Sequence, residues 1–327
     1  MSRSQHPGGS HPQGHAHGSA GVHGSAGDHE HHGTDVDWGR MADQLETGGE
    51  VQLPVLRRVA ERLRDLVEPG VDVRRVLDVG SGPGVMTCVL AETFTGAEVV
   101  AVDGAPALLD RAAARGERLG LGGRVSTRHA ELPEGFQGDG LGAADVVWSS
   151  KAVHHLGDQQ QALDLVAGTL RPGGVLAVAE GGLPARFLPR DIGVGRPGLH
   201  ARLDLLEDTW FATMRAGLPG SVAVVEDWPA MLRHAGLDAV TSFTLVLDLP
   251  APLEAQARTY LHGHLSRLRE VAAESLDAVD LDALDVLLDP DSPAGILRRP
   301  DAFLLAGTTV FAGVRPPGRA RRVSAAG

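Results

Sequence analysis

The segment "VLDVGSGPGVMTCVLAETF", Val76–Phe94, constrains the fold of this chain more than any other part of the sequence. A short apolar run leads through an acidic residue to three glycines that alternate with other residues, and helix-compatible residues follow. Glycine tolerates the backbone angles of a tight turn. The pattern therefore predicts a buried strand, a glycine loop and the start of a helix.

Strand-like and helical segments alternate after this loop. The strand-like segments are 74–80, 97–104, 124–132, 144–156 and 169–182, and helical segments between them include 105–120 and 158–170. This βαβ succession predicts an α/β fold with a mostly parallel sheet and helices on both faces. Two more strands are expected at 239–250 and 302–315, separated by a mostly helical block from 253 to 288.

Composition divides the chain into tails, a core and insertions. Residues 1–33 hold eight of the fifteen histidines and almost nothing apolar, so they cannot offset their ordering entropy by burial. We predict a disordered tail over 1–35, one domain over 36–315 and a basic disordered tail over 316–327. Within the domain, the expected parts are N-terminal helices over 36–70 that break around Gly48-Gly49, a core over 71–182, and lid-forming helical insertions over 183–225 and 253–299.

Charge and cysteine content restrict the class of protein. The net charge of -12 argues against a nucleic-acid partner, which requires a basic face. The single cysteine, Cys88, rules out an internal disulfide framework and fits a reducing compartment. No apolar run is long enough for a membrane span, and no leader pattern is evident. We therefore expect a soluble, cytoplasmic protein without a membrane partner, and leave a homodimer open.

Two classes of ligand use a glycine loop at the carboxyl end of the first strand: dinucleotides and adenosyl sulfonium cofactors. A dinucleotide loop requires Gly-x-Gly-x-x-Gly. Here Gly80, Gly82 and Gly84 alternate, and Val85 stands in the place of the third dinucleotide glycine. Asp103 ends the second strand, where its carboxylate can accept hydrogen bonds from both ribose hydroxyls. The spacing disfavours a nicotinamide dinucleotide.

Taken together, these segments resemble the class I S-adenosylmethionine-dependent methyltransferases. The likeness rests on "VLDVGSGPG", "VVAVDGAP", "STRHAEL", "ADVVWSSKAVHHL" and "TLRPGGVLAVAE", which occur in family order between Val73 and Gly182. The resemblance implies a Rossmann-like sheet of seven strands, mostly parallel, whose last strand is antiparallel. It also implies S-adenosyl-L-methionine as the cofactor and methyl transfer as the reaction.

The resemblance assigns cofactor-binding roles to matched positions. Residues around the methionine part would be Asp78, Gly80, Ser81, Gly82 and Gly84, those at the ribose Asp103, Gly104 and Ala105, and those at the adenine Ala130, Glu131 and Leu132. Asp78 would attract the ammonium of the cofactor, and Ser149 would begin the segment that closes over the reacting sulfur.

A small-molecule methyl acceptor is expected near the ends of the fourth and fifth strands. Three candidate catalytic residues follow the fourth strand: Lys151, His154 and His155. Histidine suits proton removal near neutral pH, although one ring of such a pair often only packs or caps. Lys151 is the only lysine of the chain, which hints at a need for a compact ammonium there.

Two other functions remain open from the sequence. One is a non-catalytic cofactor-binding or metal-handling protein that uses the His-rich tail, and the less favoured one is an NAD-dependent oxidoreductase. His262 and His264 are two residues apart, which places them on different faces of a helix. We therefore predict no metal site in the folded domain.

Overall fold

The computed structural model describes residues 38–131, 133–136, 140–273 and 275–317. These residues belong to one compact unit, Gly33–Gly327. The tail predicted over 1–35, residues 318–327 of the basic tail and the predicted adenine contact Leu132 lie outside the described residues.

In the described residues, seven strands form one sheet, and helices precede and connect them. The strands are β1 Arg75–Val79, β2 Glu98–Asp103, β3 Val125–His129, β4 Ala144–Ser150, β5 Leu170–Arg186, β6 Asp238–Leu249 and β7 Leu304–Val314. The α-helices are α1 Trp38–Val51, α2 Leu53–Leu66, α3 Val85–Thr93, α4 Pro106–Arg118, α5 Gln159–Gly168, α6 Leu199–Gly217, α7 Trp228–His234, α8 Ala255–Ala272 and α9 Ala278–Leu288. Two short 3-10 helices are η1 Glu134–Phe136 and η2 Val153–His155.

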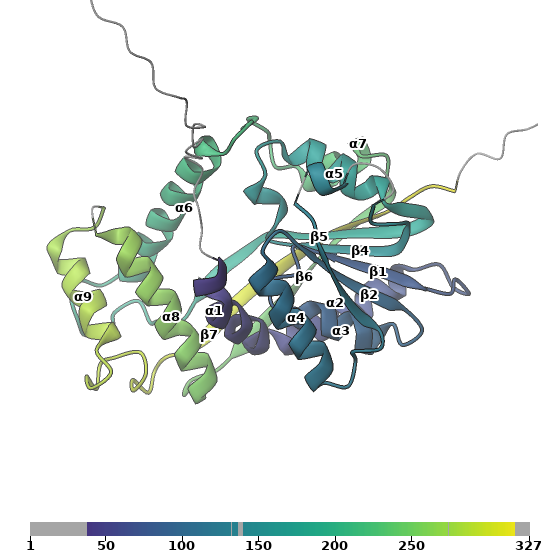
Figure 1. Cartoon of the computed structure of the whole chain (residues 1–327). Coiled ribbons are helices and arrows are strands. Elements are labelled where there is room, and N and C mark those ends of the chain that lie inside the picture. The colour runs from purple at the N-terminus through teal and green to yellow at the C-terminus, as the bar shows by residue number, and fades with distance from the viewer. Residues whose placement is uncertain (1–37, 132, 137–139, 274, 318–327) are drawn as a thin grey trace, which may run out of the picture. The chain divides into compact units, whose positions relative to one another are not determined.

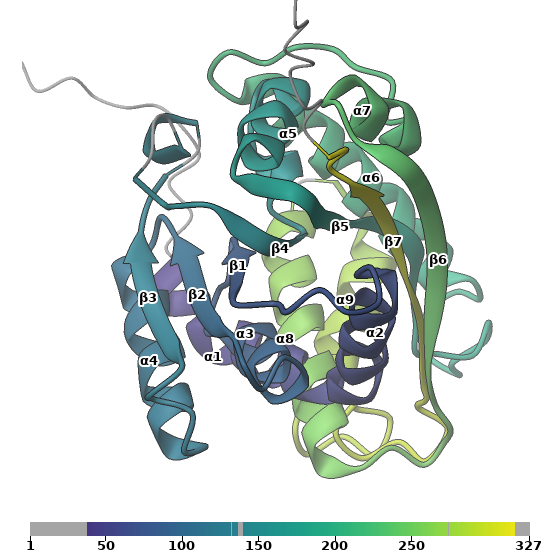
Figure 2. The same cartoon turned by 90° about the vertical axis from the view of Figure 1, so that its right-hand side faces the viewer.

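The strand order is β3-β2-β1-β4-β5-β7-β6, which Figure 2 shows from one edge of the sheet to the other. The pairs from β3 to β5 are parallel, whereas β7 runs antiparallel to both of its neighbours. This confirms the predicted fold, including the antiparallel last strand. The order reverses between β1 and β4, and open α/β sheets bind ligands beyond the strand ends at such a switch point.

The two faces of the sheet carry separate apolar cores. Residues such as Leu77 and Val147 pack with α5 and α7, while Val76 and Val146 face the opposite side. Helices α2 and α3 lie on that opposite side, and Figure 1 shows α5 and α7 apart from them. Strands β1, β2 and β4 are almost wholly buried, as expected for parallel strands covered on both faces.

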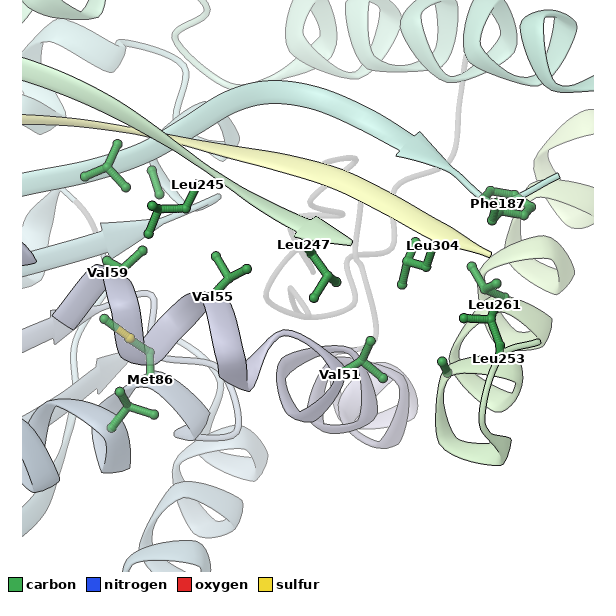
Figure 3. Packing of buried hydrophobic residues seen from close by; sticks show 14 of the residues in the cluster. Val51, Val55, Val59, Met86, Phe187, Leu245, Leu247, Leu253, Leu261 and Leu304 are labelled. Atoms are coloured by element: carbon green, nitrogen blue, oxygen red, sulfur yellow. The ribbon is translucent and has the colours of Figure 1, made fainter. Parts of the chain in front are cut away.

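Helix α2 fixes the N-terminal segment to the sheet. Val55, Val59 and Leu63 recur every four residues and are buried, so they form one apolar stripe along the helix. Figure 3 shows Val55 and Val59 beside Leu245 of β6. Burial of each such side chain contributes about 1.5–3 kcal/mol.

The predicted helix break around Gly48-Gly49 is wrong, because α1 continues to Val51. The two glycines serve close packing instead. A Cβ on Gly48 would lie 2.8 Å from Cε2 of Tyr260, and one on Gly49 would lie 2.7 Å from Cγ2 of Val85. The break falls at Gln52 because Pro54 starts a new helix, where its missing N–H costs no helical hydrogen bond.

The two predicted insertions contribute α6, α8 and α9. Strand β5 itself continues to Arg186, past the core boundary expected at 182. Helices α6 and α8 are neighbours, and Figure 1 shows them with α9 to one side of the sheet. Among the described residues, none of the helices is long and apolar enough to cross a membrane.

Candidate functional site

The glycine loop takes the shape that its spacing predicts. Gly80, Gly82 and Gly84 have φ values of 71°, 54° and 76°, in the left-handed region that favours glycine. A Cβ on Gly84 would lie 2.6 Å from Cβ of Ala112 in α4, whereas a Cβ on Gly82 would meet no atom within 4 Å. Gly84 therefore allows α3 and α4 to approach, and Gly82 borders open space.

Asp103 holds the loop from the end of β2. Its Oδ2 accepts a hydrogen bond from the Gly82 amide and its Oδ1 accepts one from the Ala105 amide, each at 2.9 Å. Each carboxylate oxygen has a second lone pair, and the residue is only half-buried. Asp103 can therefore bind a ribose beside Gly82 while it keeps both amide contacts.

Asp78 lies beneath the loop with 2% of its surface exposed. The Thr87 hydroxyl of α3 donates a 2.6 Å hydrogen bond to its Oδ2. Burial raises the pKa of Asp78 to about 7, the Thr87 hydrogen bond opposes the rise, and the nearby charge of Asp103 adds to it. A buried carboxyl with such a pKa favours a cationic partner, which would stabilise its ionised form.

The segment expected at the adenine lies beside Asp103. The Ala130 amide donates to the Asp103 carbonyl oxygen at 3.1 Å. Nε2 of His129 lies 3.0 Å from the Gly104 carbonyl oxygen. A Cβ on Gly104 would lie 3.0 Å from Cγ of Glu131, so those two residues are adjacent. The structure thus brings the described members of the predicted ribose and adenine sets together.

Ser149 and Ser81 are less open than the rest of the predicted set. Ser149, near the end of β4, has no exposed surface, and its Oγ has no hydrogen-bond partner among the described residues. Ser81 is 9% exposed, and its amide donates to the Val102 carbonyl oxygen at 3.1 Å. Both side chains are thus largely closed to solvent.

His154 is oriented by Glu180, which is buried on β5. Oε2 of Glu180 lies 2.7 Å from Nδ1 of His154, while Oε1 accepts hydrogen bonds from the Ala152 amide at 3.2 Å and the Val153 amide at 3.0 Å. With the proton on Nδ1, His154 donates to the carboxylate and presents the lone pair of Nε2. One carboxylate thus fixes both the η2 turn and the imidazole tautomer.

His155 lies in a different environment. Its ring centroid is 4.3 Å from that of His154. Burial lowers the pKa of His155 to about 4, and the charges of His154 and Arg215 lower it further. Arg215 of α6 donates a 2.8 Å hydrogen bond to the His154 carbonyl oxygen and also binds the Leu156 carbonyl oxygen. Because His155 is held neutral, it suits packing better than proton transfer at neutral pH.

Lys151 follows β4 directly and has a φ of 52°, one of two positive φ values outside glycine among the described residues. This conformation costs a residue with a Cβ about 1–2 kcal/mol. Its amide donates to the Ala179 carbonyl oxygen at 3.1 Å, which ties the turn to β5. The strained backbone thus lies between the end of β4 and the η2 turn.

The sequence did not single out the helical residues that cover this end of the sheet. On α6 these are Glu207, Phe211 and Arg215, spaced by four residues and hence on one face. The Phe211 ring meets the His154 ring edge-on, with centroids 5.3 Å apart. Their spacing along one helix was the available signal, but their partners lie far away in sequence, at the η2 turn and on α8.

No group of three or more His, Cys, Asp or Glu residues in the described parts of the chain is placed to hold a metal ion. His262 and His264 have separate partners. Nε2 of His262 lies 3.1 Å from the Leu288 carbonyl oxygen, and Nε2 of His264 lies 4.0 Å from Oε1 of Glu207. The metal-handling alternative rests on tail residues outside the described part of the chain.

Comparison with known proteins agrees with this geometry. Residues 77–176 match the model of a methyltransferase domain. Trans-aconitate 2-methyltransferase of Methylobacterium radiotolerans is 29% identical over 75% of this chain and 80% of that protein. The 27-O-demethylrifamycin SV methyltransferase of Amycolatopsis mediterranei is 27% identical over 69% of this chain and 76% of that protein.

Among solved structures, a SAM-dependent methyltransferase from Geobacter sulfurreducens in complex with S-adenosylhomocysteine is similar with a TM-score of 0.43 and 23% identity, over 80% of this chain and 90% of that one. The domain match runs from Leu77 in β1 to Leu176 in β5, so it includes the glycine loop, Asp103 and His154 but ends before Glu180. The domain match and these relatives support S-adenosylmethionine-dependent methyl transfer as the activity of this chain.

Proposed function

We propose that this methyltransferase acts on a hydroxyl group of a small molecule bound beyond the carboxyl ends of β4 and β5, with His154 as the general base. The observation that carries the proposal is the contact between Nδ1 of His154 and Glu180, which turns Nε2 into a proton acceptor. Two relatives are named for small-molecule substrates, trans-aconitate and 27-O-demethylrifamycin SV, and these names support a small molecule as the acceptor.

The cofactor fits the residues around the glycine loop. Open space at Gly82 leaves room for a ligand, Asp103 offers lone pairs to ribose hydroxyls, and Asp78 offers a carboxylate to an ammonium. Bound there, S-adenosylmethionine supplies an electrophilic methyl group on a sulfonium. Gly104, Ala105, Ala130 and Glu131 would border the ribose and adenine, and Ser149 would lie under the reacting end.

His154 would take the proton of the acceptor hydroxyl on Nε2 as the oxygen forms its bond to the methyl carbon. The electron pair of the broken bond between sulfur and carbon stays on sulfur, so the products are a methyl ether and a thioether. Glu180 stabilises the imidazolium that results, because its carboxylate remains bound to Nδ1. Phe211 and Arg215 hold this unit under α6 and limit the access of water.

The regions 183–225 and 253–299 would act as a lid over the acceptor. Helix α6 contacts His154 and the η2 turn. Helix α1 contacts α8, because Nε2 of Gln44 in α1 donates a 3.0 Å hydrogen bond to the carbonyl oxygen of Tyr260 in α8. Arg115 of α4 binds Glu46 and Glu50 of α1 at 2.8 and 3.0 Å. Motion of the lid would thus be felt at both the acceptor and the cofactor.

A calorimetric titration tests the cofactor site. We expect S-adenosylhomocysteine to bind the full chain and NAD not to bind. Asp103→Ala should weaken S-adenosylhomocysteine binding by about 1–3 kcal/mol, the range for charge-assisted hydrogen bonds, and Asp103→Asn should lie between Ala and the parent. Equal affinity in all three proteins would remove Asp103 from the ribose site, and retention of NAD alone would overturn the proposed cofactor.

Binding of S-adenosylhomocysteine should also depend on pH through Asp78. Because the pKa of Asp78 is raised to about 7, the carboxyl is mostly neutral at pH 6 and ionised at pH 8. A ligand ammonium that needs the ionised form should bind about tenfold more tightly at the higher pH. The same raised pKa means that the ligand-free fold loses stability as pH rises from about 4 towards 7.

The control for this titration is Asp78→Asn, which keeps the shape and cannot ionise. Any dependence on pH that persists in Asp78→Asn belongs to the ligand or to other groups. An identical slope in parent and variant would contradict the assignment of Asp78 to the ammonium.

The composition of the chain guides the proposals on its location and partners. The proposed location is the cytoplasm, in keeping with the single cysteine of the chain. We propose no nucleic-acid partner, because the chain carries a net charge of -12. A homodimer is a further proposal, for which sedimentation of the full chain is the direct measurement.

A further inference from the structure

The η2 turn that carries His154 is held from two sides. On the side of the sheet, Glu180 of β5 binds two amides of the turn and Nδ1 of His154. On the other side, α6 contacts the turn: the Phe211 ring meets the His154 ring, and Arg215 donates to the His154 carbonyl oxygen. The position of this imidazole therefore depends on the packing of both elements.

The guanidinium of Arg215 uses its donors on the turn and not on a carboxylate. Its Nη1 donates to the His154 carbonyl oxygen at 2.8 Å and also to that of Leu156, and its Nη2 donates more loosely to that of Gly157 at 3.4 Å. Within the described residues, no Asp or Glu forms an ion pair with Arg215, although it is half-buried. These carbonyl groups lie at the carboxyl end of η2, where a cation is favoured.

The chain that follows α6 approaches the same turn. The Val222 amide donates to the Gly157 carbonyl oxygen at 3.0 Å. A Cβ on Gly157 would clash with the Pro219 carbonyl oxygen. The Ser221 hydroxyl donates to the Arg215 carbonyl oxygen at 2.9 Å, which closes the end of α6. The end of α6 and the exit of η2 thus pack backbone against backbone.

We propose that Arg215 is a positioning residue for the reaction: it seats the η2 turn so that Nδ1 of His154 stays on Glu180 and Nε2 faces the acceptor. This inference rests on the proposed function. Without the guanidinium, three carbonyl oxygens lose a charged donor, and the water that replaces it does not fix the direction of the turn. The base is therefore complete only while the end of α6 is docked.

Three variants disturb this seat in different ways. Arg215→Gln removes the charge and all but one of the donor groups. Arg215→Lys keeps the charge, but a compact ammonium cannot reproduce the fork of a guanidinium. Gly157→Ala leaves every ring and charge in place and displaces the turn from the chain after α6, because its methyl would meet the Pro219 carbonyl oxygen.

Arg315→Gln is the matched control. Arg315 likewise donates to carbonyl oxygens at the carboxyl end of a helix, that of Gly168 in α5 at 3.0 Å and those of two neighbouring residues. Its amide donates to the Gly174 carbonyl oxygen near the start of β5, whereas Glu180 lies further along that strand. The control therefore removes the same kind of contact at another helix end.

The experiment follows the histidine ring nitrogens of the full chain by NMR in the presence of saturating S-adenosylhomocysteine, with His154→Gln to assign the His154 signals. The parent is expected to carry the proton on Nδ1. In Arg215→Gln and Gly157→Ala, that proton should exchange with water about tenfold faster or more, since the ring leaves Glu180 more often. Arg215→Lys should lie between, and Arg315→Gln should match the parent.

Turnover gives the second readout. Arg215→Gln should lower kcat about tenfold or more, while the affinity for S-adenosylhomocysteine stays unchanged. In the His154→Ala background the same change should add little, because a residue that acts through His154 has nothing left to orient. Equal factors in both backgrounds would mean that Arg215 only stabilises α6, which contradicts the proposal.

Unchanged proton exchange at His154 in Arg215→Gln would overturn the positioning role, and so would the same acceleration in Arg315→Gln. If Arg215→Gln does not fold, Gly157→Ala decides by the same criteria. The proposed function fails in a different way: a parent with its proton on Nε2, or parental turnover in His154→Ala, would remove the base, while the exchange rates would still report whether Arg215 seats the turn.

Discussion

Replacement of His154 by Ala is expected to lower kcat by about 10²- to 10⁴-fold, while the affinity for S-adenosylhomocysteine stays unchanged. The reason is that the proton of the acceptor moves only during the chemical step. The loss should shrink as pH rises, because the acceptor hydroxyl then ionises without a base. The measurement is a profile of kcat against pH for the parent and the variant.

Two further variants show whether His154 acts as a base or only fills space. Glu180→Gln keeps the size of the side chain but removes the charge that stabilises the imidazolium, so it should also lower kcat. His155→Ala removes the neighbouring ring, which the lowered pKa marks as neutral, and should retain most activity. If His154→Ala turns over like the parent at every pH, the pair with Glu180 is structural and the base assignment fails.

The fold was predictable because its signals are local. The apolar runs of β1, β2 and β4, the glycines after β1 and the acidic residue after β2 all lie within short windows. The apolar residues of β1, β2 and β4 are buried, as these runs predict. The wrong prediction at Gly48-Gly49 came from the same local rule, since glycine breaks helices in general but here makes room for Tyr260 and Val85.

The acceptor end of the site was only partly predictable because its contacts are non-local. The sequence places His154 and Glu180 near neighbouring strand ends, but it does not show that one carboxylate binds both the imidazole and the η2 amides. Neither does it show that Arg267 on α8 approaches Glu207 on α6, with Nη2 and Oε1 3.7 Å apart. Such convergence depends on how the two insertions pack, which no short window encodes.

Two glycines of one loop should respond differently to the same substitution. Gly84→Ala is expected to destabilise the protein by about 2–5 kcal/mol, because the new methyl would lie 2.6 Å from Cβ and 2.7 Å from Cα of Ala112, in addition to the strain of a positive φ. Gly82→Ala should cost only about 1–2 kcal/mol, since its strain is the same in kind but no atom lies within 4 Å.

Gly82→Ala should be the more stable of the two variants and yet the one that binds S-adenosylhomocysteine poorly. The methyl of Gly82→Ala occupies the open space beside Asp103, so this variant should lose about tenfold or more in S-adenosylhomocysteine affinity while it stays well folded. Urea unfolding gives the free energies of unfolding, and calorimetry gives the affinities. Parental affinity in Gly82→Ala would mean that the cofactor does not approach the loop at this point, whereas similar free energies of unfolding in both variants would mean that α4 yields to the methyl at Gly84.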